Sequence, residues 1–366
     1  MTLRGGTREI RVGRAAVGGG APVSVQSMSN RDPHDPAAVA AQAERCAALG
    51  CDIFRITVPD VEAAAALAEV KRRTSLPIVA DVHFDWRCAL AAIEAGCDAL
   101  RINPGNIGAA ERIRAVAGAA AERRIPIRIG VNAGSLEKDL DAQVRSGAKT
   151  APEALCESAL RNLAILEAEG FRDIAISAKA SNVPDTLAAY RLLAERTDCP
   201  LHLGVTEAGT LLPGTVRSSV ALGILLSEGI GDTVRVSLTA EPEREVRAGC
   251  EILRSLGMRP PGPSVTSCPT CGRTRVPLEK TAQAVEEALE ALYAGETGAK
   301  YRAAGRPFPR VAVMGCAVNG PGEAKGADIA LCGADGYFIL YINGAPAGRA
   351  DAEEAPGKVV EHVVSL

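Results

Sequence analysis

Two octapeptides, Gly50-Cys-Asp-Ile-Phe-Arg-Ile-Thr57 and Gly96-Cys-Asp-Ala-Leu-Arg-Ile-Asn103, repeat one pattern. Looser copies follow at residues 170–177 and 229–237. Each copy begins with glycine, which suits the C-cap of a preceding helix. Each then continues into a short apolar run rich in β-branched residues, which is typical of a buried strand. The repeated pattern therefore predicts four helix-to-strand junctions.

A second phrase alternates with the first. It reads Pro77-Ile-Val-Ala-Asp81 and recurs at residues 126–130 and 200–204, with Pro22-Val-Ser-Val-Gln26 at the front. Segments rich in Ala, Glu and Arg at helical spacing separate the runs, at residues 37–49, 61–73 and 111–123. Eight strands that alternate with helices over residues 1–259 predict a (β/α)8 barrel. An open doubly wound sheet is the alternative, but no Gly-x-Gly-x-x-Gly turn opens the first unit.

The pattern stops at Pro260-Pro-Gly-Pro263, which we interpret as a stiff linker. Residues 264–366 then contain a Cys-bearing turn, a helix over about 281–293, and strands at 311, 329–331 and 337–342. We expect this part to form a smaller α+β domain.

Composition excludes several classes of protein. The chain has 366 residues, a net charge of -3 and 3% aromatic residues, which disfavour a nucleic-acid surface. No stretch reaches membrane-spanning length and no apolar leader precedes the barrel, so we expect a cytoplasmic protein without a membrane contact. Eleven cysteines then indicate a reducing compartment. Eight of them fall in apolar patterns and are expected in the core: Cys46, Cys51, Cys88, Cys97, Cys156, Cys199, Cys250 and Cys332.

Polar residues occur at even spacings near the carboxyl ends of seven predicted strands, so each pair lies on one face. They are Arg55 and Thr57, Asp81 and His83, Arg101 and Asn103, Arg128 and Asn132, Ser177 and Lys179, His202 and Thr206, and Arg235 and Ser237. The carboxyl ends of barrel strands form the active-site face. His83 is the best histidine candidate, whereas His202 is expected to lie deeper.

Five of these residues are cations, and the two acids Asp81 and Glu207 do not balance them. Like charges that lie about 4 Å apart repel by about 4 kcal/mol at an effective dielectric of about 20. The pattern therefore predicts a polyanionic ligand, and Arg suits phosphate oxygens. The alternative is that some arginines pair with acids at strand starts, such as Asp52 or Asp98.

A candidate metal site lies in the C-terminal part. Cys268-Pro-Thr-Cys271 is answered by Gly315-Cys316-Ala-Val-Asn319-Gly-Pro-Gly-Glu323. A Cys-x-x-Cys pair serves zinc, redox disulfides and iron–sulfur clusters alike. No second pair completes a zinc ribbon, and glycines around Cys316 allow a loop to curl around an inorganic group. We favour a metal or cluster site.

These two motifs resemble the 4-hydroxy-3-methylbut-2-enyl diphosphate synthase family of the methylerythritol phosphate route to isoprenoids. The resemblance extends through Val25-Gln-Ser-Met-Ser-Asn30, Arg101-Ile-Asn-Pro-Gly-Asn-Ile-Gly108, Gly130-Val-Asn-Ala-Gly-Ser-Leu-Glu-Lys138 and Thr206-Glu-Ala-Gly209. Arg31 departs from it, because a small hydroxyl residue is expected there.

The resemblance implies a reductive ring opening and dehydroxylation of 2-C-methyl-D-erythritol 2,4-cyclodiphosphate. It implies one 4Fe–4S cluster per subunit, with Cys268, Cys271, Cys316 and Glu323 as ligands, and reduced flavodoxin or ferredoxin as electron donor. The substrate site then comprises Arg55, Asp81, His83, Arg101, Asn103, Arg128, Asn132, Lys179, Thr206, Glu207, Arg235 and Ser237. Glu207 is the favoured proton-transfer group, with Asn319 and His83 as further catalytic candidates.

Two other functions stay open at this point. One is a non-redox phosphate-binding barrel enzyme with a structural zinc, and the other is a cluster carrier without enzymatic activity. A carrier does not need five cations at a barrel mouth, so binding of a diphosphate discriminates against it.

The eighth helix of the barrel, at about residues 241–256, is expected to end on the face opposite the site. A four-residue linker spans at most about 14 Å, which is too short to return to the mouth. This geometry predicts a head-to-tail homodimer in which one subunit's cluster serves the other's barrel, as the family resemblance also implies.

Overall fold

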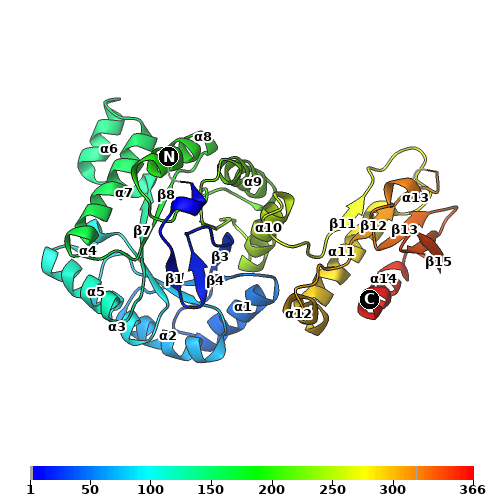
Figure 1. Cartoon of the computed structure of the whole chain (residues 1–366), viewed down its shortest axis with the longest axis horizontal. Coiled ribbons are helices and arrows are strands. Elements are labelled where there is room, and N and C mark those ends of the chain that lie inside the picture. The colour runs from blue at the N-terminus through cyan, green and yellow to red at the C-terminus, as the bar shows by residue number, and fades with distance from the viewer. Residues whose placement is uncertain (1–2, 319) are drawn as a thin grey trace. The chain divides into compact units, whose positions relative to one another are not determined.

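The computed structural model describes residues 3–318 and 320–366. The chain folds as two compact units, Met1–Arg259 and Pro260–Leu366. Figure 1 shows the first unit as a ring of helices around a central set of strands. Of the candidate site residues, Asn319 lies outside the described residues.

Eight parallel strands form the centre of the first unit, in the order β8-β7-β6-β5-β4-β3-β10-β9. A parallel bridge between Ile176 and Leu201 joins the two ends of this order. The expected (β/α)8 barrel is thus confirmed. The strands are β3 (Ser24–Met28), β4 (Ile53–Thr57), β5 (Ile78–Asp81), β6 (Ala99–Ile102), β7 (Ile127–Asn132), β8 (Ile174–Lys179), β9 (His202–Leu203) and β10 (Thr233–Val234).

Helices follow the strands and pack their apolar faces against them. They are α1 (Pro36–Ala48), α2 (Val61–Arg73), α3 (Trp86–Glu94), α4 (Pro104–Ile107), α5 (Ala110–Glu122), α6 (Lys138–Arg145), α7 (Ala151–Ala168), α8 (Val183–Arg196), α9 (Leu211–Ser227) and α10 (Pro242–Ser255). The expected glycine caps hold, because Gly50 and Gly96 have φ values of 103° and 84°. Two short 3-10 turns, η1 (Arg4–Gly6) and η2 (Ala133–Ser135), complete the unit.

An N-terminal hairpin, β1 (Ile10–Val12) with β2 (Ala15–Val17), closes one end of the barrel. Its apolar residues pack against Ile53, Val79 and Ala99 near the starts of β4, β5 and β6. The hairpin therefore fills the amino-terminal end and leaves the carboxyl ends of the strands for a site. The sequence patterns did not predict this hairpin.

The second unit contains a sheet in the order β11-β12-β13-β14-β15. Its strands are β11 (Val265–Ser267), β12 (Val311–Met314), β13 (Ile329–Gly333), β14 (Phe338–Ile342) and β15 (Ala345–Ala350), and its helices are α11 (Leu278–Ala294), α12 (Glu296–Ala303), α13 (Gly320–Glu323) and α14 (Ala355–Ser365). β11, β12 and β13 run parallel, and β14 and β15 are antiparallel additions. The smaller domain is mixed α and β, as expected.

Alternation along β12 sets the two faces of this sheet. Val311 and Val313 join a core with Val285 of α11 and Val359 of α14. Ala312 and Met314 point to the other face and pack in a smaller cluster that includes Ala324, just after α13. Long helices therefore cover one face, and α13, which ends at Glu323, lies over the other.

Candidate active site

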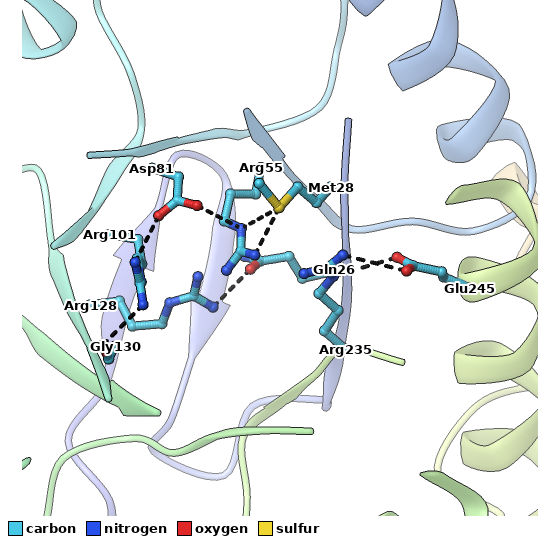
Figure 2. A network of polar contacts seen from close by, with 9 residues as sticks. All are labelled: Gln26, Met28, Arg55, Asp81, Arg101, Arg128, Gly130, Arg235 and Glu245. Carbon is cyan, nitrogen blue, oxygen red and sulfur yellow. Dashed lines mark hydrogen bonds and ion pairs between the residues drawn. The ribbon is translucent and has the colours of Figure 1, made fainter. Parts of the chain in front are cut away.

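A layer of buried and half-buried cations crosses the inside of the barrel, and Figure 2 shows its four arginines. The prediction that all of them lie near the carboxyl ends of the strands is wrong for Arg128, which is the second residue of the six-residue β7. Its members come from five strands or strand ends: Arg55 from β4, Arg101 from β6, Arg128 from β7, Lys179 from β8 and Arg235 after β10. Arg101, Arg128 and Lys179 are each at most 7% exposed. We call these five residues the cation layer. The fold thus brings the five predicted cations into one place.

Asp81 is the carboxylate in the middle of this layer, and it is 2% exposed. Its Oδ1 lies 3.3 Å from Nη1 of Arg101, and its Oδ2 lies 3.6 Å from Nε of Arg55. Burial alone raises a carboxyl pKa, but Arg55 and Arg101 outweigh it and hold the pKa of Asp81 below its usual value. Asp81 is therefore an ionised partner of two arginines.

Arg55 also donates from Nε and Nη2 to the thioether of Met28, at 3.1 Å and 2.8 Å. A thioether is a weak acceptor. Burial, together with Arg235 and Arg101, lowers the pKa of Arg55 to about 10, although Asp81 acts in the opposite direction. Besides its ion pair with Asp81 at 3.6 Å, the guanidinium therefore has only a thioether as acceptor, and it keeps capacity for a stronger one.

Arg128 has the least compensation among the arginines of the layer. Its Nη1 donates to Oε1 of Gln26 at 2.8 Å, while Nε and Nη2 are buried without a partner among the described residues. Burial and the neighbouring Arg55 and Arg101 lower its pKa well below the usual value. Buried donors without acceptors are expensive, so this side chain is prepared for an anion.

Arg235 pairs with Glu245 of α10. Its Nε and Nη2 each lie 3.4 Å from a carboxylate oxygen of Glu245. Glu245 is fixed by the Ser27 hydroxyl at 2.8 Å and by the Leu238 N–H at 3.0 Å. The sequence reasoning missed this second buried acid. The helical spacing could have predicted that Glu245 is buried, since it shares a helical face with the buried Gly249 and Ile252.

Lys179 lies within the layer, 6% exposed. Its pKa is lowered well below the usual lysine value, mainly by burial and further by the nearby cations Arg235, Arg55 and Arg128. Two buried acids, Asp81 and Glu245, face three buried and two half-buried cations in this part of the barrel. The excess positive charge is what a polyanion would neutralise.

The alternative pairing with acids at strand starts is wrong for these arginines. Asp52 accepts from the Val25 N–H and from Arg259, and Asp98 pairs with Lys71. Both acids lie at the amino ends of their strands and are engaged there. Acids at the amino ends of the strands therefore do not neutralise the cation layer.

The other predicted site residues are placed around this layer with different exposure. Asn103 is buried, with Oδ1 lacking a partner among the described residues, while Asn132, Thr206 and Ser237 are half-buried. His83 and Glu207 are exposed in the loops after β5 and β9. Glu207 has a φ of 53°, an uncommon left-handed conformation for a residue other than glycine. These two side chains are accessible rather than part of the buried layer.

His202 lies below the layer, as expected. It is fully buried, and its Nδ1 is 3.4 Å from Oγ1 of Thr233. Burial and the nearby Arg128 and Lys179 lower its pKa well below the usual histidine value. It lines a small cavity of about 30 Å³ with Gln26 and Thr233, closed from below by Val12 of the hairpin.

In the second unit, the sheet brings the motif cysteines to one end. Cys268 follows β11 and Cys316 follows β12 after one residue, and these strands are parallel neighbours. The Gly315 N–H donates to Sγ of Cys268 at 3.3 Å, and the Gly320 N–H donates to the Cys316 carbonyl at 3.1 Å. α13 then carries Glu323. Two separate motifs thus converge at the same sheet end.

The motif cysteines differ from the rest. Cys271 is exposed, and Cys268 and Cys316 are half-buried. The eight cysteines expected in the core are all buried, which confirms that prediction. Among the described residues, no three His, Cys, Asp or Glu side chains already stand in a metal-binding arrangement. The donor types and their accessibility fit an iron–sulfur cluster.

Comparisons with known proteins cover both units. Residues 7–250 match the GcpE TIM-barrel domain, and residues 264–365 match the GcpE protein C-terminal domain. A 4-hydroxy-3-methylbut-2-en-1-yl diphosphate synthase (flavodoxin) of Geobacter sulfurreducens is 52% identical over 342 residues, covering 93% of this chain and 92% of that protein. The protein of the same name from Ruminiclostridium cellulolyticum is 47% identical over 363 residues, covering 99% of this chain and 98% of its own length.

Proposed function

This chain belongs to the GcpE family, and on that premise we infer that it catalyses the reaction of its relatives. The reaction is the reductive ring opening and dehydroxylation of 2-C-methyl-D-erythritol 2,4-cyclodiphosphate to 4-hydroxy-3-methylbut-2-enyl diphosphate, in isoprenoid biosynthesis. The enzyme is a flavodoxin-dependent oxidoreductase, in line with the names of the relatives. Ferredoxin is a second candidate donor.

The observation that carries the proposal is the charge of the cation layer. The cyclic diphosphate is a compact polyanion, and the five cations of the layer, three buried and two half-buried, surround two buried acids. The free donors of Arg128 are suited to phosphate oxygens. We assign the diphosphate to this layer, with Asn103, Asn132, Thr206 and Ser237 as polar contacts at its rim.

We assign a 4Fe–4S cluster to the second unit, with Cys268, Cys271, Cys316 and Glu323 as its ligands. When bound, such a cluster supplies electrons one at a time, and the iron held by carboxylate is the more exchangeable one. The protein's own contribution is to hold three thiols and one carboxylate at the end of β11 and β12. The eight buried cysteines remain thiols of the core.

Proton transfer is assigned to the accessible acid Glu207, whose carboxyl group stands in the loop after β9. A group that exchanges protons must reach both substrate and solvent, and the exposure of Glu207 permits this. His83, in the loop after β5, is the alternative donor. Asn319 is proposed to contact the substrate from the cluster side.

We also propose a head-to-tail homodimer. Arg259, the last residue of the barrel unit, donates to Asp52 at 3.0 Å, and Asp52 directly precedes β4. The chain therefore leaves the barrel at its amino-terminal face, and the short linker of about 14 Å does not reach the mouth. A second subunit supplies the cluster instead.

The surface of α9 supports this assembly. Leu212, Val216, Val220 and Ile224 form a row at four-residue spacing and are 75%, 52%, 46% and 37% exposed. Arg217 is the single charged residue of this helix. An uncharged apolar row suits a self-complementary two-fold interface.

Anaerobic reconstitution with iron and sulfide, followed by EPR with and without the cyclodiphosphate, tests the function. We expect a cluster signal that the substrate alters. A zinc-loaded protein without a cluster signal would favour the non-redox barrel enzyme. A cluster signal that does not change when the cyclodiphosphate is added would favour a carrier.

Subunit mixing tests the dimer. Cys271→Ser and Glu207→Gln each inactivate one half of a site, so a mixed dimer has one site with two intact halves. We expect activity toward half that of the wild type per mixed dimer. No recovery after demonstrated exchange would contradict the assembly.

A further inference from the structure

The repeated phrases of the sequence correspond to neighbouring strands. Copies of the first phrase form β4, β6, β8 and β10, and copies of the second form β5, β7, β9 and β3. Three copies of the second phrase end at Asp81, Gly130 and Gly204. These three equivalent positions each receive a cation from the preceding strand.

The first of these positions receives its cation by charge. Arg55 of β4 reaches Oδ2 of Asp81 on β5 at 3.6 Å. In the next pair of strands the receiving position has no side chain. Arg101 of β6 lies across Gly130 of β7 and donates from Nη2 to the Gly130 carbonyl at 3.0 Å, as Figure 2 shows.

The fit of Arg101 to Gly130 leaves no room for a methyl group. A Cβ at position 130 would overlap Nε of Arg101 and lie 2.6 Å from its Nη2 and 2.7 Å from its Cζ. No other neighbour is as close. Gly130 does not adopt a positive φ, so the backbone conformation is not the reason for glycine here.

Gly204 repeats the arrangement for Lys179. A Cβ at position 204 would lie 2.9 Å from Nζ of Lys179 on β8, and 2.6 Å from the Arg235 carbonyl. Gly204 also lacks a positive φ. The closest atom at position 204 is therefore a backbone carbonyl, whereas the three closest atoms at position 130 all belong to Arg101.

We propose that Gly130 is a positioning residue that holds Arg101 in the cation layer by leaving its own side-chain position empty. The proposal rests on the proposed function, since it assigns Arg101 to diphosphate. In this arrangement Arg101 keeps its guanidinium between Asp81 and the Gly130 carbonyl. A methyl group would displace the guanidinium and break both contacts.

The test is a double-mutant cycle of Gly130→Ala and Arg101→Leu in the reconstituted full-length protein. The probe is inorganic pyrophosphate, titrated by calorimetry, with melting temperature measured alongside. Gly118→Ala on α5 is the control, because a Cβ there meets nothing within 4 Å. Each barrel variant is expected to weaken binding about tenfold to a hundredfold, as for lost charge-assisted hydrogen bonds, and the double variant no further.

Several outcomes would overturn the proposal. Wild-type affinity in Gly130→Ala beside weak binding in Arg101→Leu would show that the glycine does not position the cation. Losses that multiply in the double variant would show independent roles. If Gly130→Ala melts early, Arg101→Leu must restore its melting temperature, and failure to do so also rejects the proposal. Unchanged binding in Arg101→Leu would instead reject the diphosphate site itself.

Discussion

The barrel site and the cysteine site are built in opposite ways. In the barrel, the cation layer is buried or half-buried, and its arginines contact Asp81, Gln26 and Glu245. In the second unit, Cys271 is exposed, and the described residues contain no completed metal-binding group. A rigid closed sheet can preorganise a charged site. Loops at a sheet end depend on the group they bind, because metal binding is coupled to local folding.

The largest expected effect is loss of the cluster without any change in anion binding by the barrel. Cys268→Ala, Cys271→Ser or Cys316→Ser should each abolish or degrade the cluster and with it turnover, while pyrophosphate binding to the barrel stays unchanged. Iron and sulfide content, EPR and calorimetry measure these quantities. Cys46→Ala, in the barrel core, is the matched control. Full cluster content with full activity in any of the three variants would reject that ligand.

Glu323→Ala tests whether the carboxylate of the cysteine site acts differently from its three thiolates. A carboxylate is a harder and more exchangeable ligand than a thiolate. We expect this variant to retain more iron than the cysteine variants yet to lose most of its turnover. Iron content and turnover are measured on the same preparation, with Glu279→Ala at the exposed start of α11 for comparison. Turnover equal to that of the wild type would remove Glu323 from the site.

Substitutions in the barrel should leave the cluster intact and act on the anion. Arg128→Leu or Arg235→Leu should weaken diphosphate binding by about 1.5–3 kcal/mol for each charge-assisted hydrogen bond lost. Arg→Lys at either position should recover part of the loss, since lysine lacks the planar fork. Calorimetric titration provides the affinities, with Arg114→Leu on the exposed face of α5 as the control. Unchanged affinity in both Leu variants would mean that these arginines are structural.

The smallest expected effect is on the free energy of unfolding, which the burial of Lys179 near other cations lowers. The pKa of Lys179 is lowered well below about 10.5, the value of an unfolded lysine. Between these two pKa values the unfolded chain binds a proton that the folded chain does not, so stability rises with pH there. Lys179→Met should therefore stabilise the ligand-free protein by about 1–4 kcal/mol, most strongly below the lowered pKa and less as pH approaches about 10.5.

Urea unfolding at several pH values measures this change, and Lys280→Met on α11 is the exposed control. The same Lys179 variant should bind pyrophosphate more weakly than the wild type. A stabilisation that does not vary with pH would indicate a packing effect in place of the removal of a buried charge.

Short-range patterns predicted much of the barrel because they reflect local geometry. The copies of Gly50–Thr57 and Pro77–Asp81 located the strands, and α2 spans the predicted residues 61–73. Even spacing within each strand, as between Arg55 and Thr57, predicted that both residues of a pair lie on one face, since side chains alternate along a strand. The N-terminal hairpin was not predicted, because its strands are three residues long and become stable by covering the barrel.

By itself, the sequence predicted the repeat of strands and helices and the five cations of the barrel strands, and it contained the two cysteine motifs. Tertiary structure decided which acid meets which cation. Glu245 reaches Arg235 from α10, ten residues along the chain, and Asp81 lies between arginines of two neighbouring strands. Tertiary structure also explains why residue 130 is a glycine, because Arg101 from another strand occupies the space of a side chain at that position. Spacing fixes the direction of a side chain, whereas its partners depend on strand order and packing.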